Sequence, residues 1–471
     1  WLKSKGGSSV LLLLGSDLAE MTSIFSRVSK VTEKAEEKAC ESICGKGSVH
    51  AFHRIRMMFE ELNPRVYGQT YKSHHLFMTN LVMMIKQTSL EERYKNPLYR
   101  GKQHHFYDAE VFQRAVRYGQ HAKAAGLRNK KKICRAVPGL RQDDILHIEG
   151  TSEVGNPNFF LCIDRKYDEI VLSIRGTSSI ADALTDLDAV RADLCGGYAH
   201  SGVMQRANYV FEHIAEKIYE LHKSTGKKVV ITGHSLGAAT AILVMIKLFG
   251  EATGVVNGII AERVVKCYAF APPPVFGPMN KIPRWANATT HTFVHYCDMV
   301  PRSQIYTAIK VMLAWKKVDE ADICESARLN FIFGRTGSEL QHTLPDHEEA
   351  GQDLLAMYPP YFHVGKILLL WRDHEESKSI CCQVQSDVLD RLILDPSMLT
   401  CHLMGGKDGG YMQRFRDMLE QDAPQTWGTS FARTFGMGRE TQASTMLQAA
   451  EPDEFDEEEE DNEELDSSTK I

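Results

Sequence analysis

The sequence has no apolar run close to the roughly 18 residues that a transmembrane helix requires. The leucine-rich stretch Val10–Leu14 is much too short to cross a bilayer. The chain begins with Trp1 and not with Met, so we expect that an N-terminal segment precedes it, with a membrane anchor as one candidate. Any membrane attachment by the sequence itself is therefore expected at the membrane surface.

The sequence also lacks the cysteine spacings of zinc sites and of disulfide-stabilised domains. Its 11 cysteines are scattered from Cys40 to Cys401, so we expect reduced thiols of the kind found in cytosolic proteins. No internal repeat is present, and 43% hydrophobic with 25% charged residues is an ordinary globular composition. Because the 471 residues exceed the roughly 250–300 that one core supports, we expect one large domain with appended segments.

Negative charge is concentrated near the C-terminus. Residues 451–466 contain 12 acidic residues and no basic one. A segment of this kind cannot bury a core, so we predict a disordered tail over residues 426–471 that is acidic from residue 451.

Positive charge is concentrated between Arg93 and Arg135, where 12 Lys and Arg stand against only Asp108 and Glu110. Two interpretations fit this segment. It is a set of solvent-facing helical faces, or it is a surface for anionic lipid headgroups, where each basic residue contributes about 1 kcal/mol. We predict contact with a membrane through residues 93–135, a cytoplasmic location with peripheral membrane association, and no nucleic-acid partner. The oligomeric state stays open.

Apolar periodicity divides the chain into a helical first part and an alternating second part. Residues 1–50 have little periodicity and are expected to be loosely structured, whereas 51–135 are expected to form helices that pack on a larger domain. Between 136 and 425, short apolar runs alternate with helical patterns, which predicts a mainly parallel α/β sheet covered on both faces. The expected strands are 158–164, 169–176, 227–233, 263–271, 291–297 and 366–371, and the expected helices include 112–125, 209–222 and 238–249.

The segment Val229–Phe249 holds a G-x-S-x-G pattern centred on Ser235. By itself the pattern is weak, because chance gives about one match in seven chains of this length. Here it lies where an apolar strand turns into a helix of small residues, which is the setting of a nucleophile elbow. A serine hydroxyl is nearly unreactive at neutral pH unless a base takes its proton. We therefore predict Ser235 as a nucleophile that needs a histidine.

Acyl transfer also needs donors for the oxyanion and an acid for the histidine. We predict the backbone N–H of Leu236 as one donor and Thr177, which follows an Arg-Gly pair at a strand end, as the other; an ordinary turn residue is the alternative for Thr177. Asp298 directly follows a strand and precedes Pro301. Its carboxylate is therefore expected at the edge of the sheet where ligands bind, with a capping aspartate as the alternative.

Several stretches together resemble the class 3 (fungal-type) lipases, and within them the sn-1-specific diacylglycerol lipases. The resemblance extends from about Phe112 to Leu419 and implies an α/β-hydrolase fold, a Ser-Asp-His triad, acylglycerol substrates and a lid. Ser235 then matches the nucleophile of the family, Asp298 its acid and Thr177 its oxyanion residue. The stretches are FFLCIDRKYDEIVLSIRGTSSIADALTDL, AHSGV, VVITGHSLGAATA, CYAFAPPPVF, HYCDMVPR and PPYFHVGKILLL.

The base follows the acid in chain order in α/β hydrolases, and five histidines follow Asp298: His342, His347, His363, His374 and His402. His363 precedes a strand and is expected at the end of the sheet opposite the catalytic edge. His402 lies in a loop after the last strand, from which an imidazole can return to the nucleophile. The resemblance agrees, because the family histidine lies in a loop similar to Met-Leu-Thr-Asp-His; here Cys401 stands in place of that aspartate. We predict His402 as the base, with His363 as the alternative.

The resulting prediction is a serine hydrolase that cleaves acylglycerol esters, diacylglycerol above all, at a membrane surface, without a metal or cofactor. The alternatives are a phospholipase, esterase or acyltransferase with the same triad, or an inactive lipase fold that serves as an interaction module. An insert at about 303–359 and the stretch after Thr177 are expected to contribute a lid.

Overall fold

The structure is a computed structural model. The described residues are 83–84, 104–150, 156–176, 191–251, 263–320, 323–324, 327, 358, 360–372, 378–395, 397–405 and 410–421. The predictions made for residues 1–50, for most of the insert 303–359 and for the acidic tail lie outside these residues. The chain divides into two compact units, Trp1–Met418 and Leu419–Ile471, and every described strand belongs to the first.

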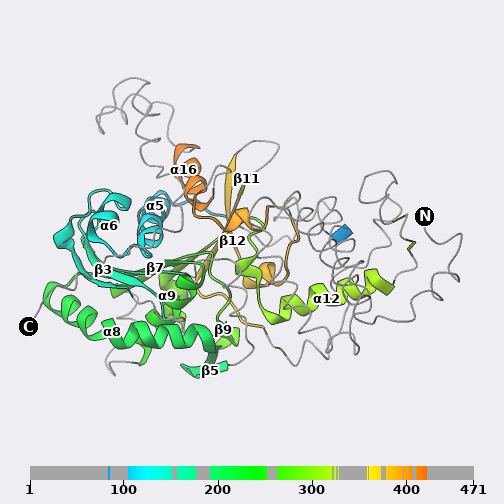
Figure 1. Cartoon of the computed structure of the whole chain (residues 1–471), viewed down its shortest axis with the longest axis horizontal. Helices are drawn as coiled ribbons and strands as arrows, with labels where there is room; N and C mark the ends of the chain where they lie inside the picture. Colours follow the sequence, from blue (N-terminus) through cyan, green and yellow to red (C-terminus); the bar gives the residue numbers. More distant parts are fainter. Residues whose placement is uncertain are drawn as a thin grey trace, which may run out of the picture. The chain divides into compact units, whose positions relative to one another are not determined.

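A nine-stranded sheet runs through this unit in the order β1-β12-β11-β10-β8-β7-β4-β3-β2 (Figure 1). Five adjacent strands in its middle are parallel, and they are buried on both faces, as parallel sheets require. These strands are β4 (Glu169–Ile174), β7 (Val229–His234), β8 (Val265–Phe270), β10 (Thr290–His295) and β11 (Lys366–Arg372). The antiparallel flanks are β3 (Phe159–Asp164) and β2 (Ile145–Glu149) on one side, and β12 (Ser379–Val384) and β1 (His104–His105) on the other.

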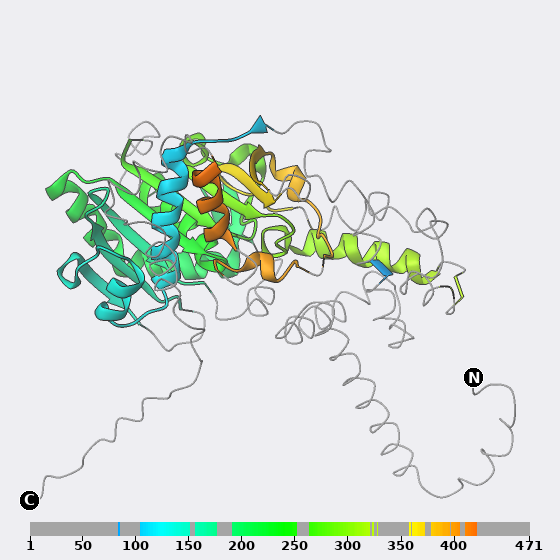
Figure 2. The same ribbon diagram turned by 90° about the horizontal axis from the view of Figure 1, so that it is seen from above.

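Helices cover both faces of the sheet (Figures 1 and 2). One face carries α8 (Ser201–Thr225) and α9 (Leu236–Ile246), and the other carries α5 (Ala109–Ala124) and α16 (Tyr411–Gln421). Every residue of α9 is buried, so this helix lies between the sheet and its neighbours and needs no polar face. The described ranges also contain the α-helices α6 (Lys130–Ala136), α11 (Arg284–Thr289) and α12 (Ile305–Glu320). A small second sheet is formed by β5 (Arg191–Leu194), β6 (Gly197–His200) and β9 (Phe276–Gly277).

The predicted fold class, an α/β hydrolase with a mainly parallel sheet, is confirmed. The six expected strands form, each within two residues of its expected limits. The helix expected at 209–222 is longer and extends from Ser201 to Thr225, where Gly226 ends it with a left-handed backbone (φ 67°). The insert at 303–359 does not begin as an irregular loop, because Ile305–Glu320 is the helix α12.

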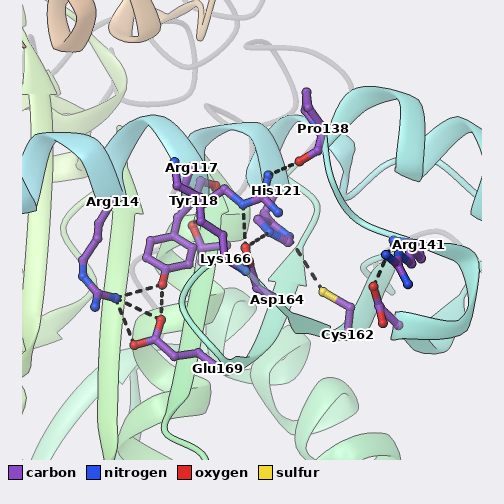
Figure 3. A network of polar contacts seen from close by, with 12 residues as sticks. Arg114, Arg117, Tyr118, His121, Pro138, Arg141, Cys162, Asp164, Lys166 and Glu169 are labelled. Carbon is purple, nitrogen blue, oxygen red and sulfur yellow. Dashed lines mark hydrogen bonds and ion pairs between the residues drawn. The ribbon is translucent and has the colours of Figure 1, made fainter. Parts of the chain in front are cut away.

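Helix α5 is attached to the sheet by buried ion pairs (Figure 3). Arg117 Nε donates to Asp164 Oδ2 at 2.6 Å, and His121 Nε2 lies 2.8 Å from the same oxygen. Arg114 Nη1 donates to both carboxylate oxygens of Glu169, at 2.9 and 3.0 Å. Burial would raise the pKa of Asp164, but the hydrogen bonds from His121 and Arg117 outweigh burial and hold that pKa below its ordinary value.

These pairs change the interpretation of the basic segment 93–135. Arg114 and Arg117 face the sheet and not solvent, so neither contributes to a membrane surface. The basic residues around α6 do face solvent, namely Lys130, Lys131, Lys132 and Arg135. Lys123 and Arg128 are exposed as well, so any surface for anionic headgroups within the described part of this segment is formed by these residues together with α6.

Candidate active site

Ser235 lies at the sharp turn between β7 and α9. Its backbone is in an unfavourable region, with φ 57° and ψ −131°, which is the kind of strain that is retained at functional positions. The turn is possible because Gly233 and Gly237 flank it. A Cβ on Gly233 would lie 2.5 Å from Gly237 C, and a Cβ on Gly237 would lie 2.4 Å from Ile174 O. Side chains at either position would separate strand from helix, so the glycines of the pattern are sterically required.

Asp298 and His402 form a buried pair, although 104 residues separate them. Asp298 follows β10, and His402 ends the short 3₁₀ turn Thr400–His402. The Nδ1 atom of His402 lies 3.0 Å from Asp298 Oδ1 and 3.1 Å from Oδ2. A carboxylate accepts hydrogen bonds only, so Nδ1 carries the proton and the lone pair of the neutral imidazole is on Nε2. Nε2 is therefore the atom that can accept a proton from a hydroxyl.

His402 is held against the elbow by His234, the residue before Ser235. The two imidazole rings are in contact, with 4.5 Å between centroids and a tilt of 36°, and His234 Nε2 donates to the backbone oxygen of His402 at 2.8 Å. Desolvation of the His234 ring, together with the neighbouring His402, lowers the pKa of His234 to about 3. His234 therefore stays neutral at physiological pH and places no positive charge beside the pair. In this way the pair Asp298–His402 lies against the residue that directly precedes Ser235.

A residue that the sequence did not indicate, Tyr411, completes the surroundings of Asp298. Its hydroxyl donates to Asp298 Oδ2 at 2.6 Å and accepts the backbone N–H of His295 at 2.8 Å. Burial and the Asp298 carboxylate raise the pKa of Tyr411 far above its ordinary value, so the hydroxyl remains a donor. Asp298 Oδ1 also accepts the N–H of Val300 at 3.0 Å. The carboxylate is thus fixed from three directions, one of which is His402.

We expect Tyr411→Phe to lower kcat about 10–100-fold, because a hydrogen bond to a charged group contributes about 1.5–3 kcal/mol. KM should change little, since Tyr411 contacts the carboxylate and not the substrate. Steady-state hydrolysis of a soluble p-nitrophenyl ester measures both constants. Tyr107→Phe is the matched control, because Tyr107 is an exposed tyrosine. An unchanged kcat in Tyr411→Phe would contradict a positioning role.

Of the two expected oxyanion donors, Leu236 lies within the described residues and Thr177 does not. Leu236 is the first residue of α9, so its N–H lies in the first turn, where no intrahelical acceptor exists. Thr177 lies outside the described residues. The strand before it ends at the elbow: a Cβ on Gly176 would lie 2.6 Å from His234 O and 3.3 Å from Ser235 Cβ.

The alternative base, His363, has a different environment. It is buried before β11, and its Nε2 donates to the backbone oxygen of Pro301 at 2.7 Å. Burial lowers its pKa to about 4. His363 is thus a neutral interior histidine with a backbone partner. The other histidines weighed for this role, His342, His347 and His374, lie outside the described residues.

Within the described ranges, no group of three or more His, Cys, Asp or Glu side chains is arranged to hold a metal ion. Nor does any helix there have the length and apolarity needed to cross a membrane.

The central part of the chain is similar in sequence to known proteins. Residues 171–307 match the family model described as Lipase (class 3). The chain is 33% identical over 144 residues to diacylglycerol lipase-beta of Mus musculus, a match that covers 29% of this chain and 20% of that protein. It is 27% identical over 147 residues to secreted mono- and diacylglycerol lipase A of Penicillium cyclopium, which covers 30% of this chain and 45% of that protein. Among solved structures, the Rhizomucor miehei lipase in its propeptide complex matches with a TM-score of 0.41 and 16% identity, over 64% of this chain and 83% of that one. The matched segment thus spans less than half the length of either sequence relative.

Proposed function

We propose that this protein is a serine hydrolase that cleaves the carboxylic ester bonds of acylglycerols, a proposal supported by the match of residues 171–307 to the class 3 lipase family model. The proposal is carried by one observation: the pair Asp298–His402, joined at 3.0 Å, lies against the elbow that holds Ser235. A nucleophile, a base and an acid on three separate segments have no structural reason to meet at one sheet edge, whereas acyl transfer requires all three together.

In this mechanism Ser235 Oγ attacks the ester carbonyl carbon while His402 Nε2 takes the hydroxyl proton. Asp298 stabilises the imidazolium that forms and keeps Nδ1 protonated. The negative charge on the former carbonyl oxygen is bound by the N–H of Leu236, with Thr177 as the second donor. His402 then gives its proton to the leaving alcohol, which leaves an acyl group on Ser235. A water molecule, deprotonated by the same imidazole, releases the fatty acid and restores the serine.

Diacylglycerol at a membrane surface is the proposed substrate. The support is the similarity to relatives whose names specify mono- and diacylglycerol lipases, together with the exposed basic residues of α6. Lys130, Lys131, Lys132 and Arg135 face solvent on one short element, and each contributes about 1 kcal/mol beside an anionic leaflet.

A comparison of substrates in identical vesicles tests this proposal. Diacylglycerol, triacylglycerol and phosphatidylcholine are each presented to the full chain, with and without phosphatidylserine, and fatty-acid release is measured against Ser235→Ala as background. We expect diacylglycerol to react at least about 10-fold faster than the other two, and phosphatidylserine to increase the rate at low salt only. Faster phospholipid cleavage, or transfer of the acyl group to an added alcohol in preference to water, would replace diacylglycerol hydrolysis by one of those activities.

A further inference from the structure

Two cysteines lie beside the proposed acid and base without a part in the mechanism. Cys297 directly precedes Asp298, and Cys401 directly precedes His402. Their Sγ atoms are 3.6 Å apart, across 104 residues of sequence. The two thiols are therefore in van der Waals contact at the point where the segment of the acid meets the segment of the base.

The thiols share a polar neighbour that keeps them in place. Ser397 Oγ lies 3.3 Å from Cys297 Sγ and 3.7 Å from Cys401 Sγ. Because Ser397 donates its hydroxyl proton to Asp395 Oδ1 at 2.5 Å, its oxygen accepts the thiol proton of Cys401, while Cys297 Sγ donates to Cys401 Sγ. The backbone joins the same two segments, since Met299 N donates to Met398 O at 3.3 Å. The loop that carries His402 is thus fixed to the segment of Asp298 through this contact.

We propose that Cys297 and Cys401 are a modification site, at which a peroxide joins the two thiols as a disulfide and thereby lowers the activity of the enzyme. Cys401 reacts first, because it is 7% exposed and Cys297 is fully buried. Its sulfur attacks one oxygen of hydrogen peroxide, the O–O bond breaks, and Cys401 becomes a sulfenic acid while the departing hydroxide takes the thiol proton and leaves as water. Cys297 Sγ then attacks the sulfenic sulfur, the S–O bond breaks, and a second water leaves with the thiol proton. Two electrons pass from the two sulfurs to the peroxide.

Formation of the bond moves the residues next to the proposed catalytic pair. A disulfide is about 2.05 Å long, so the two sulfurs must approach by about 1.5 Å from their 3.6 Å separation. Each moving residue is joined by one peptide bond to Asp298 or to His402. Displacements near 1 Å in a catalytic arrangement cost up to about 100-fold in rate. We therefore expect a reversible fall in kcat of about 10–100-fold.

The experiment treats the purified full chain with hydrogen peroxide and follows two readouts in parallel. Peptide mapping by mass spectrometry without reduction reports the Cys297–Cys401 cross-link directly, independently of any activity. Hydrolysis of a p-nitrophenyl ester before treatment, after treatment and after addition of dithiothreitol reports the effect on kcat, which rests on the proposed function. We expect the cross-linked peptide, loss of activity in proportion to it, and recovery of both after reduction.

Three variants separate this site from the other nine cysteines of the chain. In Cys297→Ser and Cys401→Ser, the fraction of activity lost on treatment should fall to near zero, each variant being compared with itself before treatment. Cys324→Ser is the matched control, because it removes an exposed thiol and should leave the wild-type sensitivity. If either serine variant fails to fold, the unaltered chain still tests the proposal, because the cross-linked peptide and the loss of kcat must appear together and both be reversed by dithiothreitol. A cross-link to another cysteine, a disulfide without loss of kcat, or equal inactivation of the serine variants overturns the proposal. An untreated chain that is itself inactive, yet forms the cross-link, counts against the proposed function instead.

Discussion

Ser235→Ala should lower ester hydrolysis about 10⁴–10⁶-fold and abolish covalent labelling of the chain by a fluorophosphonate. The size follows from the fact that members of a catalytic triad act as a unit, so that loss of the nucleophile removes nearly all of their combined effect. What remains is acceleration by the oxyanion donors and by substrate binding. The backbone strain at Ser235 (φ 57°) is unrelated to its hydroxyl, so the variant should keep its fold. Its far-UV circular dichroism and thermal midpoint check this.

The histidine is tested by a comparison of two buried imidazoles. His402→Ala should lose as much activity as Ser235→Ala, because no base then takes the serine proton. His363→Ala removes an equally buried ring whose partner is the backbone oxygen of Pro301, and it should retain kcat once the folded fraction is taken into account. Fluorophosphonate labelling of each variant, normalised to folded protein, measures the difference. Full labelling of His402→Ala together with loss of labelling in His363→Ala would exchange the two assignments.

The arrangement of these three residues was largely accessible from sequence because it depends on chain order and strand ends. Ser235 and Asp298 each follow an apolar strand, and β7, β8 and β10 are parallel, so both residues had to reach the same edge of the sheet. His402 is in a loop after β12, a strand that the apolar pattern did not indicate, yet its position late in the chain still favoured it over His363. Local pattern and topology were therefore sufficient to predict where these residues lie, while their catalytic roles stay a proposal.

The residues that support the site depend on contacts between distant segments, and periodicity carries no information about them. Tyr411 reaches Asp298 across 113 residues, and Cys297 reaches Cys401 across 104. The sequence shows that Cys401 stands where the similar family has an aspartate. It does not show that the thiol of Cys297 lies beside it.

Contacts between distant segments also explain why two arginines of α5 were wrongly expected to face solvent or a membrane. Arg114 and Arg117 look like solvent-facing residues of an amphipathic helix. Their acidic partners, Glu169 and Asp164, lie on strands 55 and 47 residues away. A basic residue in a sequence is ordinarily expected at the surface, and only the fold shows which ones are paired inside.

Acid should destabilise this protein well before its carboxylates are protonated. Three interior histidines, His291, His295 and His363, have pKa values lowered to about 4 by burial. Each makes few polar contacts: His295 Nδ1 donates to Cys401 O at 3.1 Å, and neither His291 Nδ1 nor His363 Nδ1 has a partner among the described residues. A second proton on any of these rings would introduce an unsolvated charge.

The sign of the effect follows from proton uptake. In the unfolded chain these histidines titrate near pH 6.5, whereas in the folded chain they remain neutral until about pH 4. Between those values the unfolded state binds more protons, so the free energy of unfolding falls as the pH falls. From pH 7 to pH 5 each histidine costs about 2 kcal/mol. His234, with a pKa of about 3, adds a similar amount. Together the four histidines cost about 8 kcal/mol, a large fraction of the roughly 5–15 kcal/mol that stabilises a domain.

Urea unfolding of the full chain at pH 7, 6 and 5, followed by tryptophan fluorescence, measures this dependence. The midpoint should change little above pH 7 and fall steeply below about pH 6.5. His291→Gln should reduce the slope by about one quarter, because four buried histidines share it. His213→Gln, which alters an exposed histidine, should leave the slope unchanged. The buried carboxylate Asp164 has the opposite perturbation, a lowered pKa, so its contribution is lost only as the pH falls below about 4. The pH at which stability is lost therefore distinguishes the two groups. A midpoint that is constant to pH 5 and falls only below pH 4 would assign the acid sensitivity to the ion pairs of α5 and not to the histidines.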